Sequence, residues 1–173
     1  MSVARITIDQ INSLSRAEFV ARIGPVFERS PWIAENTWPE RPFASIEALH
    51  RALCEVVRRA DEEKHLALIR AHPDLVGRAA LAGTLTPESV NEQASAGLNR
   101  LSPEEMATFQ KFNAAYRERF GFPFVICARL NKKAAILEGF ERRLKNSRTQ
   151  EIRTALEEIF KIAELRLQAL TRA

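Results

Sequence analysis

Apolar residues recur along this chain at the spacing of helices, not of strands. Over 46–57 they return every three or four residues, which is the period of an amphipathic helix. The same period predicts further helices over 16–26, 61–71, 87–98, 103–116, 131–144 and 149–170. We therefore predict an all-α fold, a compact bundle of about eight helices forming a single domain over residues 1–173.

Several of these helices begin at recognisable capping residues. Ser15 and Glu18 have the spacing of a capping box, and Ser102–Glu105 repeats that signal with a proline inserted. Thr86 followed by Pro87 reads as an N-cap with proline at the first helical position. These signals predict where the helices begin.

Two stretches depart from the helical pattern. The longest apolar run is 120–128, where Gly121 and Pro123 argue against regular helix in its first half. It is predicted to be either a short strand or a buried irregular segment. The segment carrying Trp32 and Trp38 is interrupted by prolines, and we predict a loop packed on the core.

Composition and charge narrow the class of protein. The chain has 173 residues, 46% of them hydrophobic and 28% charged, and six glycines; these values suit a helical globular protein better than a turn-rich β fold. The net charge of +4 suits an anionic small molecule as well as a nucleic acid. The amino terminus lacks the apolar core of a signal peptide, and no apolar run reaches the roughly 18 residues of a membrane span. We expect a cytoplasmic protein without a membrane partner.

The cysteines and histidines do not have the spacing of metal ligands. Cys54 and Cys127 stand alone in apolar or helical contexts without a CxxC pair. His50, His65 and His72 form no HExxH motif. We predict buried free thiols and no metal site.

His72 is the first candidate for chemistry. Pro73 biases it away from helical backbone angles, so the preceding helix should end there and present the imidazole at its terminus. An imidazole titrates near neutrality and suits acid–base catalysis, although a lone histidine is more often a capping or packing residue. His50 and His65 lie inside amphipathic helices and are predicted to be surface or boundary residues.

A short polar helix face follows. Ser89, Glu92 and Gln93 stand at i, i+3 and i+4 after the Thr86 cap, so their side chains share one face. The first turn of a helix favours an anion, and a carboxylate there can orient an imidazole. The alternative is an ordinary solvated helix face.

Arg166 lies on the apolar stripe of the last helix, between Ile162 and Leu170. An inward arginine must be paired or must meet an anionic ligand, so a structural salt bridge and a binding role stay equally open. In the helix over 131–144 we place the apolar positions at Ala135, Leu137, Phe140 and Leu144. Arg142, Arg143 and Lys145 are then predicted to be a solvated face.

The backbone of the 120–128 run is a further candidate. Its side chains are predicted to be core, but irregular buried backbone leaves N–H and C=O groups that need partners. A flat ligand with urea or amide edges can supply them.

Four motifs lie together in the order and spacing of one family. They are His72-Pro73, Ser89-x-x-Glu92-Gln93 with Ala96-Gly97-Leu98, the Phe120–Ala128 segment, and Glu164-Leu165-Arg166. They resemble the 2-oxo-4-hydroxy-4-carboxy-5-ureidoimidazoline (OHCU) decarboxylase family of urate degradation. The resemblance implies a cofactor-independent lyase, a homodimer, that releases carbon dioxide and forms (S)-allantoin.

The resemblance also implies the site. His72 looks like the catalytic acid or base, and Glu92 is assigned with it, either to orient the imidazole or to hold a substrate hydroxyl. Three parts of the chain look like substrate contacts: Pro73, the Ser89–Gln93 segment and the Phe124–Ala128 segment, the last largely through its backbone. The implied substrate-binding residues are Pro73, Ser89, Val90, Asn91, Glu92, Gln93, Phe124, Val125, Ile126, Cys127, Ala128 and Arg166.

Two other interpretations stay open. A basic helical binding module for nucleic acid or an acidic partner explains the charge of +4 but not the arginine on an apolar stripe. A member of the same family with an altered substrate is also compatible with these residues.

Overall fold

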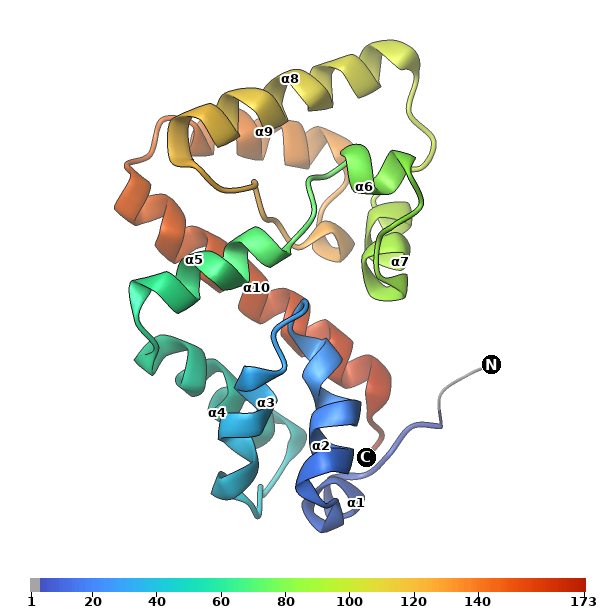
Figure 1. Ribbon diagram of the computed structural model, residues 1–173. Helices are drawn as coiled ribbons and strands as arrows, with labels where there is room; N and C mark the ends of the chain where they lie inside the picture. The colour runs from blue at the N-terminus through green and yellow to red at the C-terminus, as the bar shows by residue number, and fades with distance from the viewer. Residues whose placement is uncertain (1–3) are drawn as a thin grey trace. The chain divides into compact units, whose positions relative to one another are not determined.

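The computed structural model describes residues 4–173, and these form an all-α protein (Figure 1). Within them lie ten α-helices and three short 3-10 helices, with one isolated bridge between Ile6 and Thr171. The α-helices are α1 (Ile8–Ser13), α2 (Arg16–Ile23), α3 (Trp32–Thr37), α4 (Ile46–Arg59), α5 (Glu62–Ala71), α6 (Arg78–Leu81), α7 (Pro87–Ser95), α8 (Pro103–Phe120), α9 (Lys133–Arg143) and α10 (Arg148–Leu170). The 3-10 helices are η1 (Gly24–Val26), η2 (Trp38–Glu40) and η3 (Ala128–Leu130).

The all-α prediction is confirmed. The structure has more helices than the predicted eight or so because α1, α3 and α6 are only four to six residues long. A helix of this length spans fewer than two turns, which is too short for the spacing of its apolar residues to predict a helix.

The chain forms two compact units, Met1–Leu68 with Phe160–Ala173, and Ile69–Ile159. Helices α5 and α10 each contribute residues to both units. Among residues 4–173, no helix combines the length and the apolar character that crossing a membrane requires.

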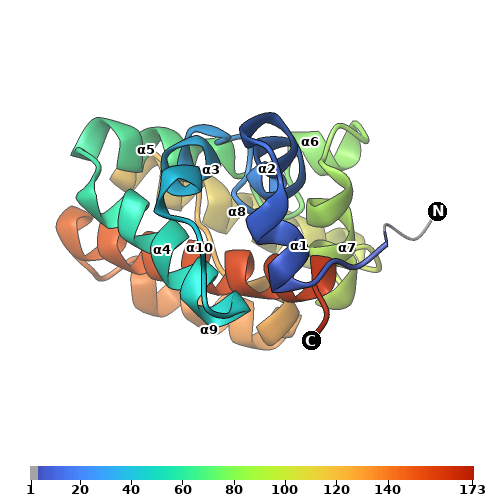
Figure 2. The same cartoon turned by 90° about the horizontal axis from the view of Figure 1, so that it is seen from below.

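The first unit has a core contributed mainly by α2, α3 and α4. Phe19 and Ile23 of α2 and Leu49 and Leu53 of α4 are all buried. Helix α3 packs against both α2 and α4, and Figure 2 shows it beside α4. The stripe predicted for 46–57 is therefore the core face of α4.

The tryptophan segment is helical, so its prediction as a loop was wrong. Trp32–Thr37 forms α3, and Trp38–Glu40 continues as η2. Proline is tolerated at the start of a helix because the N–H that it lacks has no partner there, and Pro39 occupies such a place in η2. The indole nitrogen of Trp38 donates to the Leu14 carbonyl at 3.2 Å, which ties the segment to the end of α1.

The second unit is built around an aromatic cluster between α8 and α9, which lie side by side (Figure 1). Tyr116 of α8 contacts the rings of Phe120, Phe122 and Phe124. Phe124 also stacks on Phe140 of α9 with ring centroids 3.8 Å apart. The apolar run after α8 is therefore part of this core.

The predicted helix starts are confirmed. The Ser15 hydroxyl and the Glu18 carboxylate form the reciprocal capping box of α2. Thr86 accepts from the Ser89 N–H at the start of α7, and Ser102 accepts from the Glu105 N–H at the start of α8. A cap of this kind stabilises a helix by about 1 kcal/mol.

Candidate active site

His72 is the first residue after α5, where its imidazole is buried with 6% of the residue exposed. Its backbone N–H donates to the Ile69 carbonyl at 3.2 Å and closes the last turn. The helix ends as predicted, because a proline disfavours helical backbone angles in the residue before it.

The loop 72–77 is fixed to α8 by two side chains. Arg117 donates through Nε to the Asp74 carboxylate at 2.9 Å. The Nδ2 of Asn113, a buried residue, donates to the Leu75 carbonyl at 2.7 Å. These bonds hold the backbone that follows His72.

Helix α7 holds the same loop through Gln93. The side-chain oxygen of Gln93 accepts from the Val76 N–H at 3.1 Å, and its nitrogen donates to the Asp74 carbonyl at 3.5 Å. Val76 has a φ of 54°, a left-handed conformation that a β-branched residue adopts only when its surroundings impose it. Gln93 therefore holds the strained backbone of Val76 in the loop that follows His72.

The polar face of α7 lies where the sequence predicted it. Ser89 and Gln93 are buried and Glu92 is half-buried, whereas Asn91 is exposed and Val90 is 49% exposed. Helix α7 packs against η3, which follows the apolar run. Both predicted binding segments are thus parts of the second unit.

Residues 124–127 are buried and irregular and Ala128 begins η3, so of the two structures predicted for this run the strand is excluded. The Cys127 carbonyl accepts from the Leu130 N–H at 3.1 Å and from Nδ2 of Asn131 at 3.0 Å. The Val125 carbonyl accepts from Nη1 of Arg143 at 2.6 Å. Burial is the main cause of a raised pKa for the Cys127 thiol.

The prediction that Arg143 belongs to a solvated face was wrong. Its side chain is 3% exposed and forms an ion pair with the fully buried Glu151, with Nε and Oε1 2.7 Å apart. The buried residues of α9 are Ile136, Gly139, Phe140 and Arg143. Counting the helical period from Ile136 places Arg143 on the inward stripe, and that signal was available in the sequence.

Glu151 is the centre of a small buried network. Besides Arg143, it accepts from the Tyr116 hydroxyl at 2.5 Å and from Nδ2 of Asn146 at 2.9 Å. Burial is the main cause of a pKa of Tyr116 well above its ordinary value, and the bond to Glu151 adds to it. The phenol therefore stays protonated and serves as a donor.

In the first unit, Arg166 forms a buried ion pair. Its Nη1 lies 2.8 Å from Oε2 of Glu28, with the two side chains 5% and 2% exposed. The same nitrogen donates to the Pro25 carbonyl at 3.2 Å. Arg29, next to Glu28, has a φ of 45°, so the turn that carries Glu28 contains a strained residue. The inward orientation of Arg166 is confirmed, and the structural salt bridge is present.

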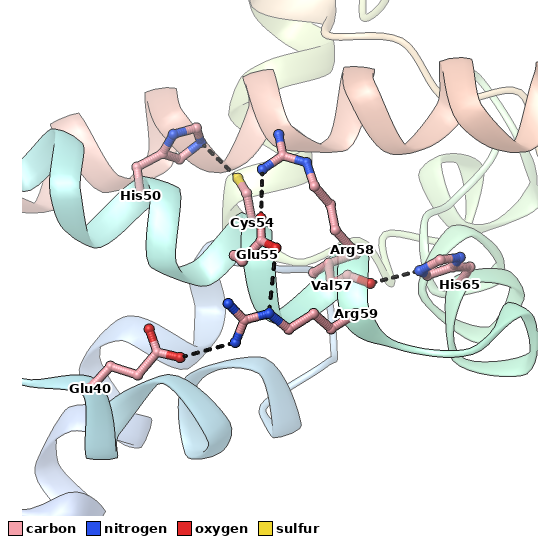
Figure 3. Close-up of polar contacts among 8 residues, drawn as sticks. All are labelled: Glu40, His50, Cys54, Glu55, Val57, Arg58, Arg59 and His65. Atoms are coloured by element: carbon pink, nitrogen blue, oxygen red, sulfur yellow. Dashed lines mark hydrogen bonds and ion pairs between the residues drawn. The ribbon is translucent and has the colours of Figure 1, made fainter.

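The other two histidines are half-buried boundary residues, as predicted. Figure 3 shows the imidazole of His50 beside Cys54 and that of His65 beside Val57. His50 Nε2 lies 2.9 Å from the Phe160 carbonyl and 3.4 Å from Sγ of Cys54. His65 Nε2 lies 2.6 Å from the Val57 carbonyl. Cys54 and Cys127 are free and buried, as predicted.

Acidic, cysteine and histidine side chains do not gather into a metal site in the part of the chain that the structure describes: there is no group of three or more. The groups at this site that can take part in chemistry are the imidazole of His72, the carboxylate of Glu92 and the backbone of 124–128.

Comparison with known proteins adds to this geometry. A model of the OHCU decarboxylase family matches residues 12–168. The chain belongs to the OHCU decarboxylase family. That match includes His72, the start of α7, the segment 124–128 and Arg166, so the predicted resemblance is confirmed.

Relatives and solved structures from the OHCU decarboxylase family agree with the assignment. The OHCU decarboxylase of Halalkalicoccus jeotgali is 44% identical and covers 98% of this chain and 94% of its own. The OHCU decarboxylase of Mus musculus is 42% identical, and the match covers 95% of this chain and 92% of the mouse protein. A crystal structure of (S)-allantoin synthase superposes with a TM-score of 0.77 at 26% identity over 96% of this chain, which spans 54% of that chain. A crystal structure of OHCU decarboxylase in the presence of (S)-allantoin superposes with a TM-score of 0.65 at 27% identity, and the match covers 80% of this chain and 89% of that one.

Proposed function

We propose that this chain catalyses the decarboxylation of OHCU to (S)-allantoin and carbon dioxide in urate degradation. The observation that carries the proposal is the family match over residues 12–168. It includes every position that the resemblance assigns to the substrate.

The substrate supplies most of the electronic requirement itself. Its carboxylate stands on a carbon next to a ring C=N bond. When the C–C bond to the carboxylate breaks, carbon dioxide leaves, the electron pair moves into that C=N bond, and its nitrogen takes up a proton. The resulting enol then tautomerises: a proton adds to the ring carbon that bears the ureido group and forms its C–H bond, while the hydroxyl on the neighbouring carbon loses its proton and becomes a carbonyl. The protein must therefore orient the ring and deliver one proton to one face, and we propose that it does so without a cofactor.

We assign the proton transfer to His72. An imidazole has an unperturbed pKa near neutrality, and this one is buried at the end of α5. The loop behind it is fixed by Asn113, Arg117 and Gln93, which keeps its position defined. Glu92 is proposed to orient the imidazole or to bind the substrate hydroxyl.

The proposed substrate contacts are Pro73, the segment 89–93 and the backbone of 124–128. Gln93 already bonds to Val76 and Asp74, so part of its contribution is to shape the loop after His72. That Arg166 binds the substrate remains a prediction from the resemblance, and its pairing with Glu28 gives the guanidinium a fixed orientation.

Three further proposals rest on the resemblance and the composition. They are a homodimer, a cytoplasmic location, and a chain that works as one domain without nucleic acid or membrane as a partner.

The proposal is tested by replacing His72 with Ala and with Asn. Urate oxidase and hydroxyisourate hydrolase generate the substrate, and circular dichroism follows the appearance of (S)-allantoin. Loss of a general acid or base lowers the rate by roughly 10²–10⁴-fold. His65→Asn on the same helix is the matched control and should keep the wild-type rate. Unchanged rates in both His72 variants would remove His72 from the mechanism.

A further inference from the structure

Arg143 contacts the proposed substrate-binding segment in two ways. Nη1 donates to the Val125 carbonyl at 2.6 Å. The guanidinium carbon also lies 4.2 Å from the ring centroid of Phe124, within the range of a cation–π contact. One side chain of α9 thus holds two consecutive residues of the segment.

The other side of the same guanidinium is fixed by Glu151. Nε of Arg143 lies 2.7 Å from Oε1 of Glu151, and Asn146 holds the other carboxylate oxygen, Oε2. The planar guanidinium is held at two nitrogens, Nε by Glu151 and Nη1 by the Val125 carbonyl, so it cannot rotate without losing the ion pair. The donor that meets Val125 is therefore held in place.

The bond to the Val125 carbonyl determines where the next N–H points. In a trans peptide the C=O of one residue and the N–H of the next point in opposite directions, and the cis peptide found in residues 4–173 is the bond between Arg41 and Pro42. Since the Val125 carbonyl faces Arg143, the Ile126 N–H faces away from it. A cationic donor on the carbonyl also polarises the peptide and makes that N–H a stronger donor.

We propose that Arg143 is a positioning residue for the reaction. By fixing and polarising the peptide between Val125 and Ile126, it directs the Ile126 N–H toward a carbonyl oxygen of the substrate. The inference rests on the proposed function, because that function makes the segment a substrate-binding one.

The test must remove the donor without leaving a buried charge. Arg143→Met alone would strand the Glu151 carboxylate, and breaking a buried pair on one side is strongly destabilising. The double variant Arg143→Met/Glu151→Gln removes both charges. Arg143→Lys/Glu151→Gln has the same neutral partner but restores a cationic donor.

Tyr116→Phe is the control for stability. It removes the hydroxyl from Glu151 and leaves the bond between Arg143 and Val125 in place. The measurements are KM, kcat and melting temperature for wild type and the three variants, in the coupled circular dichroism assay.

We expect the Met double variant to raise KM about tenfold or more with a smaller change in kcat, as for loss of a substrate-binding contact. The Lys double variant should recover part of that increase. Tyr116→Phe should lower the melting temperature and leave KM unchanged.

Two results would overturn the inference while leaving the proposed function intact. One is a wild-type KM in the Met double variant. The other is an equal rise of KM in Tyr116→Phe, which would show that loosening the network alone is sufficient. A wild-type chain that does not accelerate (S)-allantoin formation contradicts the proposed function and this inference with it.

Discussion

Replacing Glu28 with Gln should leave the buried guanidinium of Arg166 without its counter-charge. The carboxylate and the guanidinium are 2.8 Å apart, and both side chains are almost completely inaccessible to water. Gln keeps the size and one hydrogen-bond acceptor of Glu but removes the charge. The substitution therefore isolates the electrostatic part of the interaction.

The magnitude follows from burial. Breaking a buried ion pair on one side costs about 3–5 kcal/mol, because the remaining charge stays desolvated. Glu55 provides the matched control in the same unit, where Figure 3 shows it between Arg58 and Arg59. Its carboxylate lies 3.5 Å from Arg58 and 3.4 Å from Arg59, but its side chain is 43% exposed. Exposed pairs contribute at most about 1 kcal/mol, so Glu55→Gln should have a much smaller effect.

Urea denaturation of the two variants and wild type measures the difference. We expect Glu28→Gln to lower the free energy of unfolding by about 3 kcal/mol, a factor of roughly a hundred in the unfolding equilibrium. The effect should persist at high salt, since buried pairs are little screened. Equal losses in Glu28→Gln and Glu55→Gln would refute the reasoning that burial makes the first pair important.

Two further predictions concern stability. Thr86→Ala removes the side-chain cap of α7 and should cost about 1 kcal/mol in urea denaturation, whereas Thr86→Ser should be nearly neutral; equal losses would exclude the cap. Burial raises the pKa of the Cys54 thiol from 9.0 to about 12. Between these values the unfolded chain loses the thiol proton and the folded chain keeps it, so the free energy of unfolding should fall as pH rises through that window. Cys54→Ala should remove this part of the pH dependence; a wild-type slope in that variant would contradict the assignment.

Much of the fold was readable from the sequence because its signals are local. A cap such as Ser15 or Thr86 acts within one turn of its own helix, and the stripe over 46–57 requires only the helical period. The end of α5 was predicted for the same reason, since Pro73 restricts the residue before it. The helical tryptophan segment was missed because its prolines were interpreted as breaks, although one of them stands at the start of a 3-10 helix.

Burial of the two arginines could be predicted only where the apolar stripe of the helix was counted in the right register. Arg166 was recognised as inward because it lies on an apolar stripe between Ile162 and Leu170. Arg143 lies on an equivalent stripe that begins at Ile136, but the stripe of α9 was counted from Ala135. One residue of register on a helix is a rotation of about 100°, enough to move a side chain from the surface to the core.

The partner of Arg166 could not be predicted from a local sequence pattern. Glu28 and Arg166, like Asn113 and the Leu75 carbonyl, lie far apart along the chain. Local propensities carry no information on which distant groups meet, because such contacts depend on how the helices pack. The clamps on the loop after His72 therefore emerged only from the structure.

The most direct test of the central claim is the optical activity of the product made by the wild-type chain. With urate oxidase and hydroxyisourate hydrolase supplying OHCU, we predict a circular dichroism signal of (S)-allantoin that grows with the concentration of this protein. A rate equal to that of spontaneous decay, or racemic allantoin at every concentration, would contradict the account.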